Sequence, residues 1–258
     1  MELKVLGAGP AYTDRPGSTG AAYLVRAAGS AILLDLGQGS FPALASTLEP
    51  STLDAVVISH LHPDHFIDLV PLRHYLRYEF EEPRRVVVHA PAGVDARIDA
   101  LHAEPGFTAT ALDVHSLEPG QLQIGGFRVD ARRVAHTDDS FAFRVEPVGG
   151  TGDDAAAGLV YSGDCGRWED LVPVVREGDV LLVEVSFGAG PAASGAMHLD
   201  AHDIVQLTTA TRPSRVLLTH LQMGFSAEET LRVVREGFPG PTTLVEPGFE
   251  TLLSGSAA

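Results

Sequence analysis

Four residues that commonly bind metal ions lie within six positions of the chain, in the segment His60-Leu-His62-Pro-Asp64-His65. In the extended backbone that follows the apolar run 55–59, His60 and His62 point to the same side, whereas Asp64 and His65 begin a helix and turn back toward a neighbouring point. One such turn can serve two ions about 3.5–4 Å apart, the spacing of two-metal hydrolytic sites. A solvated polar turn would explain any two of these residues, but all four together predict metal binding.

One turn cannot complete the coordination of two ions, so further ligands must come from other parts of the chain. Three candidates directly follow apolar, strand-like runs, where side chains can converge on a common site: His136, Asp164 and His220. Each taken alone would be an ordinary loop residue. Together with the first cluster they predict a centre of seven His and Asp side chains, which is more than one tetrahedral ion can use.

The elements that must position these residues follow from the apolar patterns. We expect strands at 3–6, 22–26, 31–34, 55–59, 85–89, 122–124, 127–135, 141–145, 159–162, 180–185, 216–219 and 244–246, and helices at 41–48, 64–78, 94–102, 201–211 and 227–237. Strands come first in both halves, followed by strands mixed with helices, which suggests an α/β protein of two packed sheets with helices outside. No linker or repeat divides the chain, so a single domain over 1–258 is expected.

The composition excludes several classes of function. Eighteen Lys and Arg against thirty-four Asp and Glu give a net charge of −16, which opposes binding of long nucleic acids. No apolar run approaches the roughly 18 residues of a membrane span, and the first residues lack the pattern of a secretory signal, so we expect no membrane association and a cytoplasmic protein. The single cysteine, Cys165, cannot form an internal disulfide and is expected to be an inert neighbour of Asp164.

This pattern resembles the metallo-β-lactamase fold superfamily over nearly the whole chain. The resemblance implies a four-layer αββα sandwich with the site at one edge of the sheets, holding two Zn²⁺ ions, with Mn²⁺ or Fe²⁺ as alternatives. It assigns the ligands as follows: His60, His62 and His136 to one ion, Asp64, His65 and His220 to the other, and Asp164 as a bridge. Asp35, in Leu33-Leu-Asp35-Leu-Gly, looks like the family's buried structural aspartate.

Three branches of the superfamily fit less well. The di-iron oxygen-reducing members have a glutamate where this chain has His62, and penicillin-hydrolysing members often have a cysteine where this chain has Asp164. Glyoxalase II-like members usually continue the motif with glycines, unlike His65-Phe-Ile-Asp68-Leu.

The segments 65–69, 197–201 and 217–220 look most like the phosphodiesterase branch, which includes tRNA 3′-processing endonucleases and cyclic-nucleotide phosphodiesterases. His198 is similar to that branch's catalytic histidine that does not bind metal. Only 27 residues separate His136 from Asp164, too few for the long arm of the tRNA enzymes, and Leu199 stands where some of them have an acidic partner.

We therefore expect a dinuclear metal-dependent hydrolase, a phosphodiesterase that cleaves a small phosphodiester or cyclic nucleotide through a metal-bridging hydroxide. Asp64 would orient the hydroxide and His198 would protonate the leaving oxygen. The alternatives are a hydrolase of a lactone, thioester or amide, and a non-catalytic metabolite-binding protein that keeps the metal site. The expected partner is a small-molecule substrate, and a homodimer is left open. The remaining histidines are expected to be solvated or hydrogen-bonded, and among them His89 is the best candidate to line the pocket because it also ends a strand.

Overall fold

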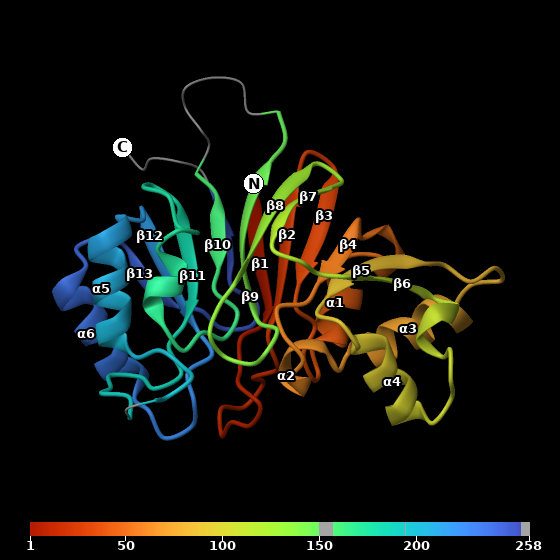
Figure 1. Ribbon diagram of the computed structural model, residues 1–258, viewed down its shortest axis with the longest axis horizontal. Coiled ribbons are helices and arrows are strands. Elements are labelled where there is room, and N and C mark those ends of the chain that lie inside the picture. The colour runs from red at the N-terminus through yellow and green to blue at the C-terminus, as the bar shows by residue number, and fades with distance from the viewer. Residues whose placement is uncertain (150–156, 194, 254–258) are drawn as a thin grey trace.

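The computed structural model describes residues 1–149, 157–193 and 195–253, and it contains two seven-stranded sheets packed face to face (Figure 1). The first sheet has the order β14-β1-β2-β3-β4-β5-β6. Its strands are β1 (Glu2–Gly7), β2 (Ala22–Ala27), β3 (Ser30–Leu34), β4 (Ala55–Val57), β5 (Val86–Ala90), β6 (Leu112–Ser116) and β14 (Glu250–Leu252). The second sheet has the order β13-β12-β11-β10-β9-β8-β7. Its strands are β7 (Gly120–Ile124), β8 (Phe127–Arg133), β9 (Phe141–Pro147), β10 (Leu159–Tyr161), β11 (Val180–Glu184), β12 (Arg215–Thr219) and β13 (Thr242–Leu244).

Helices cover the outer face of each sheet (Figure 1). The helices on the first sheet are α1 (Phe41–Thr47), α2 (Pro63–Phe66), α3 (Leu69–Tyr78) and α4 (Val94–His102). The second sheet carries α5 (Ala201–Thr211) and α6 (Ala227–Gly237). Three short 3₁₀ helices complete the connections: η1 (Pro50–Thr52), η2 (Thr108–Thr110) and η3 (Trp168–Leu171).

Three apolar layers hold this arrangement together. Successive strand residues face opposite sides, so Ala55 and Val57 of β4 pack between the two sheets while Val56 packs against the helices. The central layer also buries large aromatic rings, among them Tyr23 and Tyr161, whose centroids lie 4.9 Å apart. The layers confirm the predicted four-layer αββα sandwich of the metallo-β-lactamase fold.

The strand directions explain why one edge of the sandwich carries the polar residues. β3, β4 and β5 run parallel in the first sheet, and β10, β11 and β12 run parallel in the second. β8 and β10 are both antiparallel to the β9 that lies between them, so β8 shares the direction of β10. The carboxyl ends of all these strands therefore gather at the same edge of their sheets.

The expected elements differ from the observed ones in a few places. The helix expected at 64–78 is interrupted at Ile67 and Asp68, where the Asp68 carboxylate accepts a hydrogen bond from the Phe41 N–H at 2.8 Å. β6 and β14 were not expected, because each is a sheet edge with mostly exposed residues and little apolar signal. The last strand of the second sheet lies at Thr242–Leu244 rather than at 244–246.

Candidate metal centre

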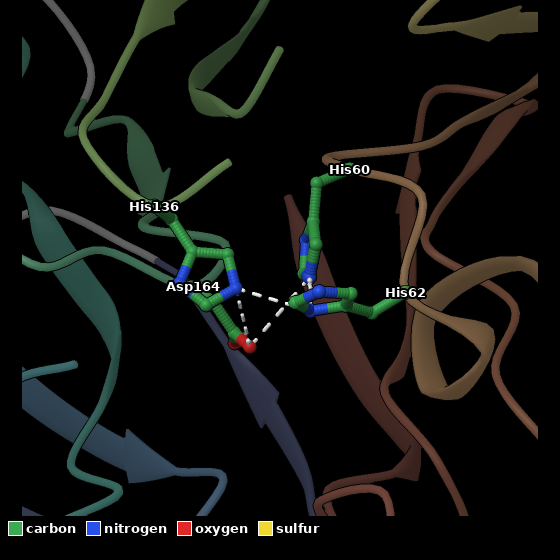
Figure 2. Close-up of side chains that lie close together, drawn as sticks. All are labelled: His60, His62, His136 and Asp164. Carbon is green, nitrogen blue, oxygen red and sulfur yellow. Dashed lines mark hydrogen bonds and ion pairs between the residues drawn. The ribbon is translucent and has the colours of Figure 1, made fainter. Parts of the chain in front are cut away.

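A first group of side chains meets between the ends of β4, β8 and β10. Figure 2 shows the rings of His60 and His62 pointing toward His136 and Asp164 from the opposite side. His62 Nδ1 lies 3.0 Å from His60 Nε2 and 3.1 Å from His136 Nε2. Nitrogens that bind one tetrahedral ion at about 2.0–2.1 Å are themselves a little over 3 Å apart. The spacing of the three rings therefore matches ligands of a single ion.

A second group lies beside the first. His220 Nε2 lies 3.2 Å from Asp64 Oδ2 and 3.3 Å from His65 Nε2, and His65 Nε2 lies 3.7 Å from the same Asp64 oxygen. All three side chains are buried. The structure thus brings together the three residues that were expected to hold a second ion.

Asp164 stands between the two groups with one oxygen toward each. Its Oδ2 lies 3.7 Å from both His60 Nε2 and His136 Nε2, and its Oδ1 lies 3.4 Å from His65 Nε2 and 3.6 Å from His220 Nε2. Oδ1 is buried without a hydrogen bond of acceptable geometry. A buried polar atom without a partner is costly, and a cation on each side of the carboxylate would satisfy it. The donor set and this orphaned oxygen fit a pair of divalent ions.

Two residues of the centre and its support have a strained backbone. Asp35 and His220 have φ of 59° and 60°, in the left-handed region that non-glycine residues rarely adopt and that clusters at functional sites. Gly37 is required for close packing, because a Cβ at this position would lie 1.8 Å from the Asp64 carbonyl oxygen. The absence of a side chain lets the segment after β3 pack directly against the metal-binding turn.

Asp35 and Ser59 orient one ring of each group from the first sheet. Asp35 Oδ2 lies 2.7 Å from His65 Nδ1 and accepts hydrogen bonds from Ser59 Oγ at 2.7 Å and from the Tyr161 hydroxyl at 2.6 Å. Ser59 Oγ also lies 3.1 Å from His60 Nδ1. Metal-binding histidines in proteins are held in this way through the ring nitrogen that does not face the metal. Asp35 is buried and its carboxylate contacts Ser59, His65 and Tyr161, which agrees with its expected structural role.

From the second sheet, Ser186 orients His220 and Glu184 orients His198. Ser186 Oγ donates to Glu184 Oε2 at 2.6 Å and lies 3.0 Å from His220 Nδ1. Glu184 Oε1 lies 2.9 Å from His198 Nδ1. His136 is held differently, by the Met197 carbonyl oxygen, which lies 2.7 Å from its Nδ1.

His198 lies over both groups. Its ring centroid is 4.7 Å from that of His136 and 5.9 Å from that of His220, and 18 % of its side chain is exposed. With Nδ1 held by Glu184, its Nε2 is the nitrogen left to act on another molecule. His198 also lies close enough to Asp164 and His220 to be counted as a third possible ligand group, so its role as a non-ligand stays a prediction.

The electrostatics of the centre favour cations. Burial lowers the pKa of His60, His62 and His136, so these rings are neutral at pH 7, as metal binding requires. Burial alone would lower the pKa of His65 as well, but the charges of Asp164 and Asp35 outweigh it and raise this pKa well above its usual value. The two carboxylates therefore stabilise a positive charge at His65.

Burial would raise the pKa of Asp164, yet the neighbouring His220 and His65 hold it well below its usual range. The pKa of Asp64 is also lowered, because hydrogen bonding and charge from His220 outweigh its burial. For His198, burial acts to lower the pKa, and the hydrogen bond and charge of Glu184 overcome it and raise the pKa to about 9. His198 therefore carries a proton at neutral pH in this environment.

Sequence reasoning missed Glu184 and the two serines. The available signal was a lone glutamate in the otherwise apolar run 180–185, since a charge inside a buried strand needs a partner. Cys165 is buried, burial raises the pKa of its thiol, and its N–H donates to Glu184 Oε1 at 3.0 Å, so it is a neighbour of the centre as expected. His89, the best candidate among the remaining histidines to line the pocket, packs against His115, with ring centroids 5.5 Å apart.

Comparisons with known proteins agree with this geometry. A family model described as a beta-lactamase superfamily domain matches residues 32–221, which are most of the chain. An uncharacterised protein of Mycobacterium tuberculosis (strain ATCC 25618 / H37Rv) is 29 % identical over 252 residues, covering 95 % of this chain and 89 % of that protein. The probable metallo-hydrolase YhfI of Bacillus subtilis (strain 168) is 25 % identical over 229 residues, covering 88 % and 90 % of the two chains.

Solved structures share the fold. The crystal structure of YhfI superposes with a TM-score of 0.82 at 20 % identity, covering 97 % of this chain and 99 % of that one. The short form of human tRNase Z gives a TM-score of 0.74 at 21 % identity, covering 98 % and 99 %. A diphosphatase of the PhnP family gives 0.74 at 16 % identity, covering 99 % of each chain.

In the described part of the chain, the helices are all too short or too polar to cross a membrane.

Proposed function

Because this chain belongs to the beta-lactamase superfamily, we propose that its centre is that of a metal-dependent phosphodiesterase whose substrate is a small phosphodiester or cyclic nucleotide. The observation that carries this proposal is His198, held by Glu184 Oε1 at 2.9 Å from its Nδ1, beside a centre of seven His and Asp side chains. Hydrolysis of a phosphodiester releases an alkoxide or a phenoxide, and an alkoxide leaving group needs a proton more than the thiolate released from a thioester does.

In this proposal the predicted ligands would divide between two ions. His60, His62 and His136 would hold one, Asp64, His65 and His220 the other, and Asp164 would contact both. When bound, divalent ions at such a site supply a more acidic water and neutralise charge on phosphate oxygens. Zn²⁺ suits this mixed nitrogen and oxygen set, and Mn²⁺ or Fe²⁺ would also be accepted.

The chain's own groups supply the remaining chemistry. The Asp64 carboxylate, held ionised by its lowered pKa, accepts a hydrogen bond from the attacking water. His198 donates the proton on Nε2 to the leaving oxygen, while Glu184 keeps the ring oriented through Nδ1. Glu184 is itself fixed by the Ser186 hydroxyl and by the Cys165 N–H. General acid catalysis of this kind contributes about 10²–10⁴ in rate.

Two arginines beside the centre favour an anionic substrate. Arg97 donates to the carbonyl oxygen of Leu61, between two predicted ligands, at 2.7 Å, and Arg15 donates to that of Leu221, next to His220, at 2.5 Å. Neither forms an ion pair with a carboxylate in the described parts of the chain. Their positive charge offsets the net charge of −16 locally, whereas the overall charge still disfavours a long polyanion.

Relatives named for phosphate chemistry support the same substrate class. A protein called ribonuclease Z from Pyrobaculum calidifontis is 25 % identical over 285 residues. The structural neighbours include tRNase Z and a diphosphatase. Only 27 residues separate His136 from Asp164, and β9 and β10 lie among them, which supports a small diester over a tRNA.

A second candidate, hydrolysis of a lactone or thioester, is favoured by the apolar side chains near the centre. Met197, whose carbonyl oxygen holds His136, is 42 % exposed, and Met223, three residues after His220, is 46 % exposed. Apolar groups of this kind suit an acyl chain.

The test is a comparison of substrates with protein reconstituted with Zn²⁺ or Mn²⁺. We expect bis-(p-nitrophenyl) phosphate or a cyclic nucleotide to be hydrolysed with a higher kcat/KM than nitrocefin, a lactone or a thioester. A carbonyl substrate that exceeds the diesters by tenfold or more would refute the phosphodiesterase assignment and favour the second candidate. A protein that binds the metals and hydrolyses none of these compounds would support a binding role instead.

A further inference from the structure

The ligands predicted around the second group come from both sheets. Asp64 and His65 follow β4 in the first sheet, and Asp164 and His220 follow β10 and β12 in the second (Figure 1). His65 Nε2 lies 3.3 Å from His220 Nε2 and 3.4 Å from Asp164 Oδ1. These distances therefore depend on how the two sheets are held relative to each other at this edge.

Tyr161 reaches from the second sheet to the first at this point. It is the last residue of β10, three positions before Asp164, and its side chain is buried in the layer between the sheets. Its hydroxyl donates a hydrogen bond to Asp35 Oδ2 at 2.6 Å. Asp35 directly follows β3 of the first sheet, and the same oxygen lies 2.7 Å from His65 Nδ1. Tyr161 is thus connected to one predicted ligand along the chain and to another through Asp35.

These contacts form a closed ring. Its first part runs from Asp164 along the chain to Tyr161 and through the hydroxyl to Asp35. Its second part runs from Asp35 to His65 and back to Asp164. The tyrosine ring is rigid, so its hydroxyl fixes where Asp35 Oδ2 can lie relative to the second sheet. A shift of that carboxylate would move the His65 ring, which it holds through Nδ1.

The other contacts of the Asp35 carboxylate come from the first sheet. The Ser59 N–H donates to Oδ1 at 2.6 Å and the Ser59 hydroxyl donates to Oδ2 at 2.7 Å. Ser59 and His65 both follow β4, so these contacts hold Asp35 within its own sheet. Among the described residues, Tyr161 supplies the hydrogen bond to this carboxylate that comes from the second sheet. A phenylalanine would fill the same space in the core, so packing alone does not require the hydroxyl.

From this arrangement we propose that Tyr161 is a positioning residue of the metal centre. Its hydroxyl, acting through Asp35, sets the place of His65 relative to Asp164 and His220. The inference rests on the metal centre of the proposed function. It gives the hydroxyl a role in the affinity and geometry of metal binding that is separate from the packing of the ring.

The experiment uses Tyr161→Phe, which removes the hydroxyl and keeps the ring. Tyr23→Phe is the matched control, because Tyr23 is buried in the same layer and its ring centroid lies 4.9 Å from that of Tyr161. The Tyr23 hydroxyl pairs with Thr219 Oγ1 at 2.6 Å. In this control Thr219 still donates to the Ala8 carbonyl oxygen, at 3.3 Å.

Three properties are measured for the wild type and both variants. Zn²⁺ affinity is measured by competition with a chelator, and the stability of the metal-free proteins is measured by urea unfolding. The visible absorption spectrum is recorded after reconstitution with Co²⁺, because this spectrum depends on the number and arrangement of the ligands.

We expect Tyr161→Phe to weaken the binding of at least one Zn²⁺ about tenfold, the lower end of the effect usual for groups that support a metal ligand. Its Co²⁺ spectrum should differ from that of the wild type. Tyr23→Phe should keep the wild-type spectrum and bind Zn²⁺ within about twofold of the wild type, because its hydroxyl lies outside the ring of contacts. Both metal-free variants should lose a similar amount of stability, since each loses one buried hydrogen bond.

Wild-type Zn²⁺ affinity and an unchanged Co²⁺ spectrum in Tyr161→Phe would overturn the proposal. Equal changes in the two variants would also overturn it, because any lost hydroxyl between the sheets would then disturb the centre. A wild type that binds neither metal would refute the metal centre and this proposal together. Because every measurement is made without substrate, a failure to hydrolyse diesters would count against the proposed activity alone.

Discussion

Replacing His198 with alanine removes the imidazole that lies over the metal centre and leaves all seven predicted ligands in place. The fold should tolerate this change because 18 % of the side chain is exposed and water can enter the space. In the variant, Glu184 Oε1 still accepts the hydrogen bond from the Cys165 N–H at 3.0 Å, and Oε2 still accepts those from the Ser186 N–H and hydroxyl. We therefore expect the loss of stability to stay within about 1.5–3 kcal/mol, the contribution of one hydrogen bond to a charged group.

The effect on catalysis should depend on the leaving group. His198 is protonated at neutral pH because Glu184 overcomes the effect of burial and raises its pKa to about 9. Without that proton, diesters with alkoxide leaving groups should lose about 10²–10⁴ in kcat, equivalent to about 3–5 kcal/mol of transition-state stabilisation. A p-nitrophenolate departs with little protonation, so bis-(p-nitrophenyl) phosphate should lose much less.

The assay compares kcat for cyclic AMP, methyl p-nitrophenyl phosphate and bis-(p-nitrophenyl) phosphate, together with metal content by elemental analysis. His202→Ala is the matched control, since His202 is an exposed histidine four positions further along the chain. Equal losses on good and poor leaving groups would refute proton donation and assign His198 to substrate binding. Loss of a metal ion in His198→Ala would make His198 a ligand, and unchanged kinetics would leave it without a catalytic role.

Three further predictions concern the metals, their supporting residues and a distant ion pair. Reconstituted protein should hold two divalent ions per chain by elemental analysis, and Asp164→Ala should hold fewer because its oxygens face both groups; a wild type that stays free of metal would contradict the assignment. Ser186→Ala should weaken metal binding roughly 10–100-fold in competition with a chelator, because its hydroxyl supports His220 Nδ1, and an unchanged affinity would count against that support. Glu146 pairs with the buried Arg144 and with two exposed arginines; burial would raise its pKa, but Arg144 lowers it below the usual value. A lowered folded-state pKa gives stability that is present above the unfolded pKa of about 4.5 and is lost as pH falls through the folded value. Glu146→Gln should therefore cost about 1 kcal/mol at pH 7, within the range for partly exposed pairs, and almost nothing at pH 2–3 in urea unfolding; an equal cost at both pH values would refute the ionic role.

The sequence determined those features of the protein that depend on local order. Apolar runs of strand length predicted two packed sheets with helices outside, and the polar residues that follow these runs predicted the seven residues that the structure brings together. The four layers of the sandwich came from the resemblance to the metallo-β-lactamase fold. The local pattern worked because buried strands are apolar over their whole length and their ends must then supply the polar groups. The same reasoning failed for β6 and β14, since exposed edge strands have no such pattern.

Only the tertiary structure decided which groups support that centre. His62 and His136 are 74 residues apart in sequence, and they meet because parallel strands of two sheets end at one edge. Glu184 and Ser186 have their roles through side-chain directions and burial, which set their contacts with His198 and His220. Arg15 likewise donates a hydrogen bond to a loop more than 200 residues away. Such contacts depend on distances across the fold, and the order of residues along the chain does not specify them.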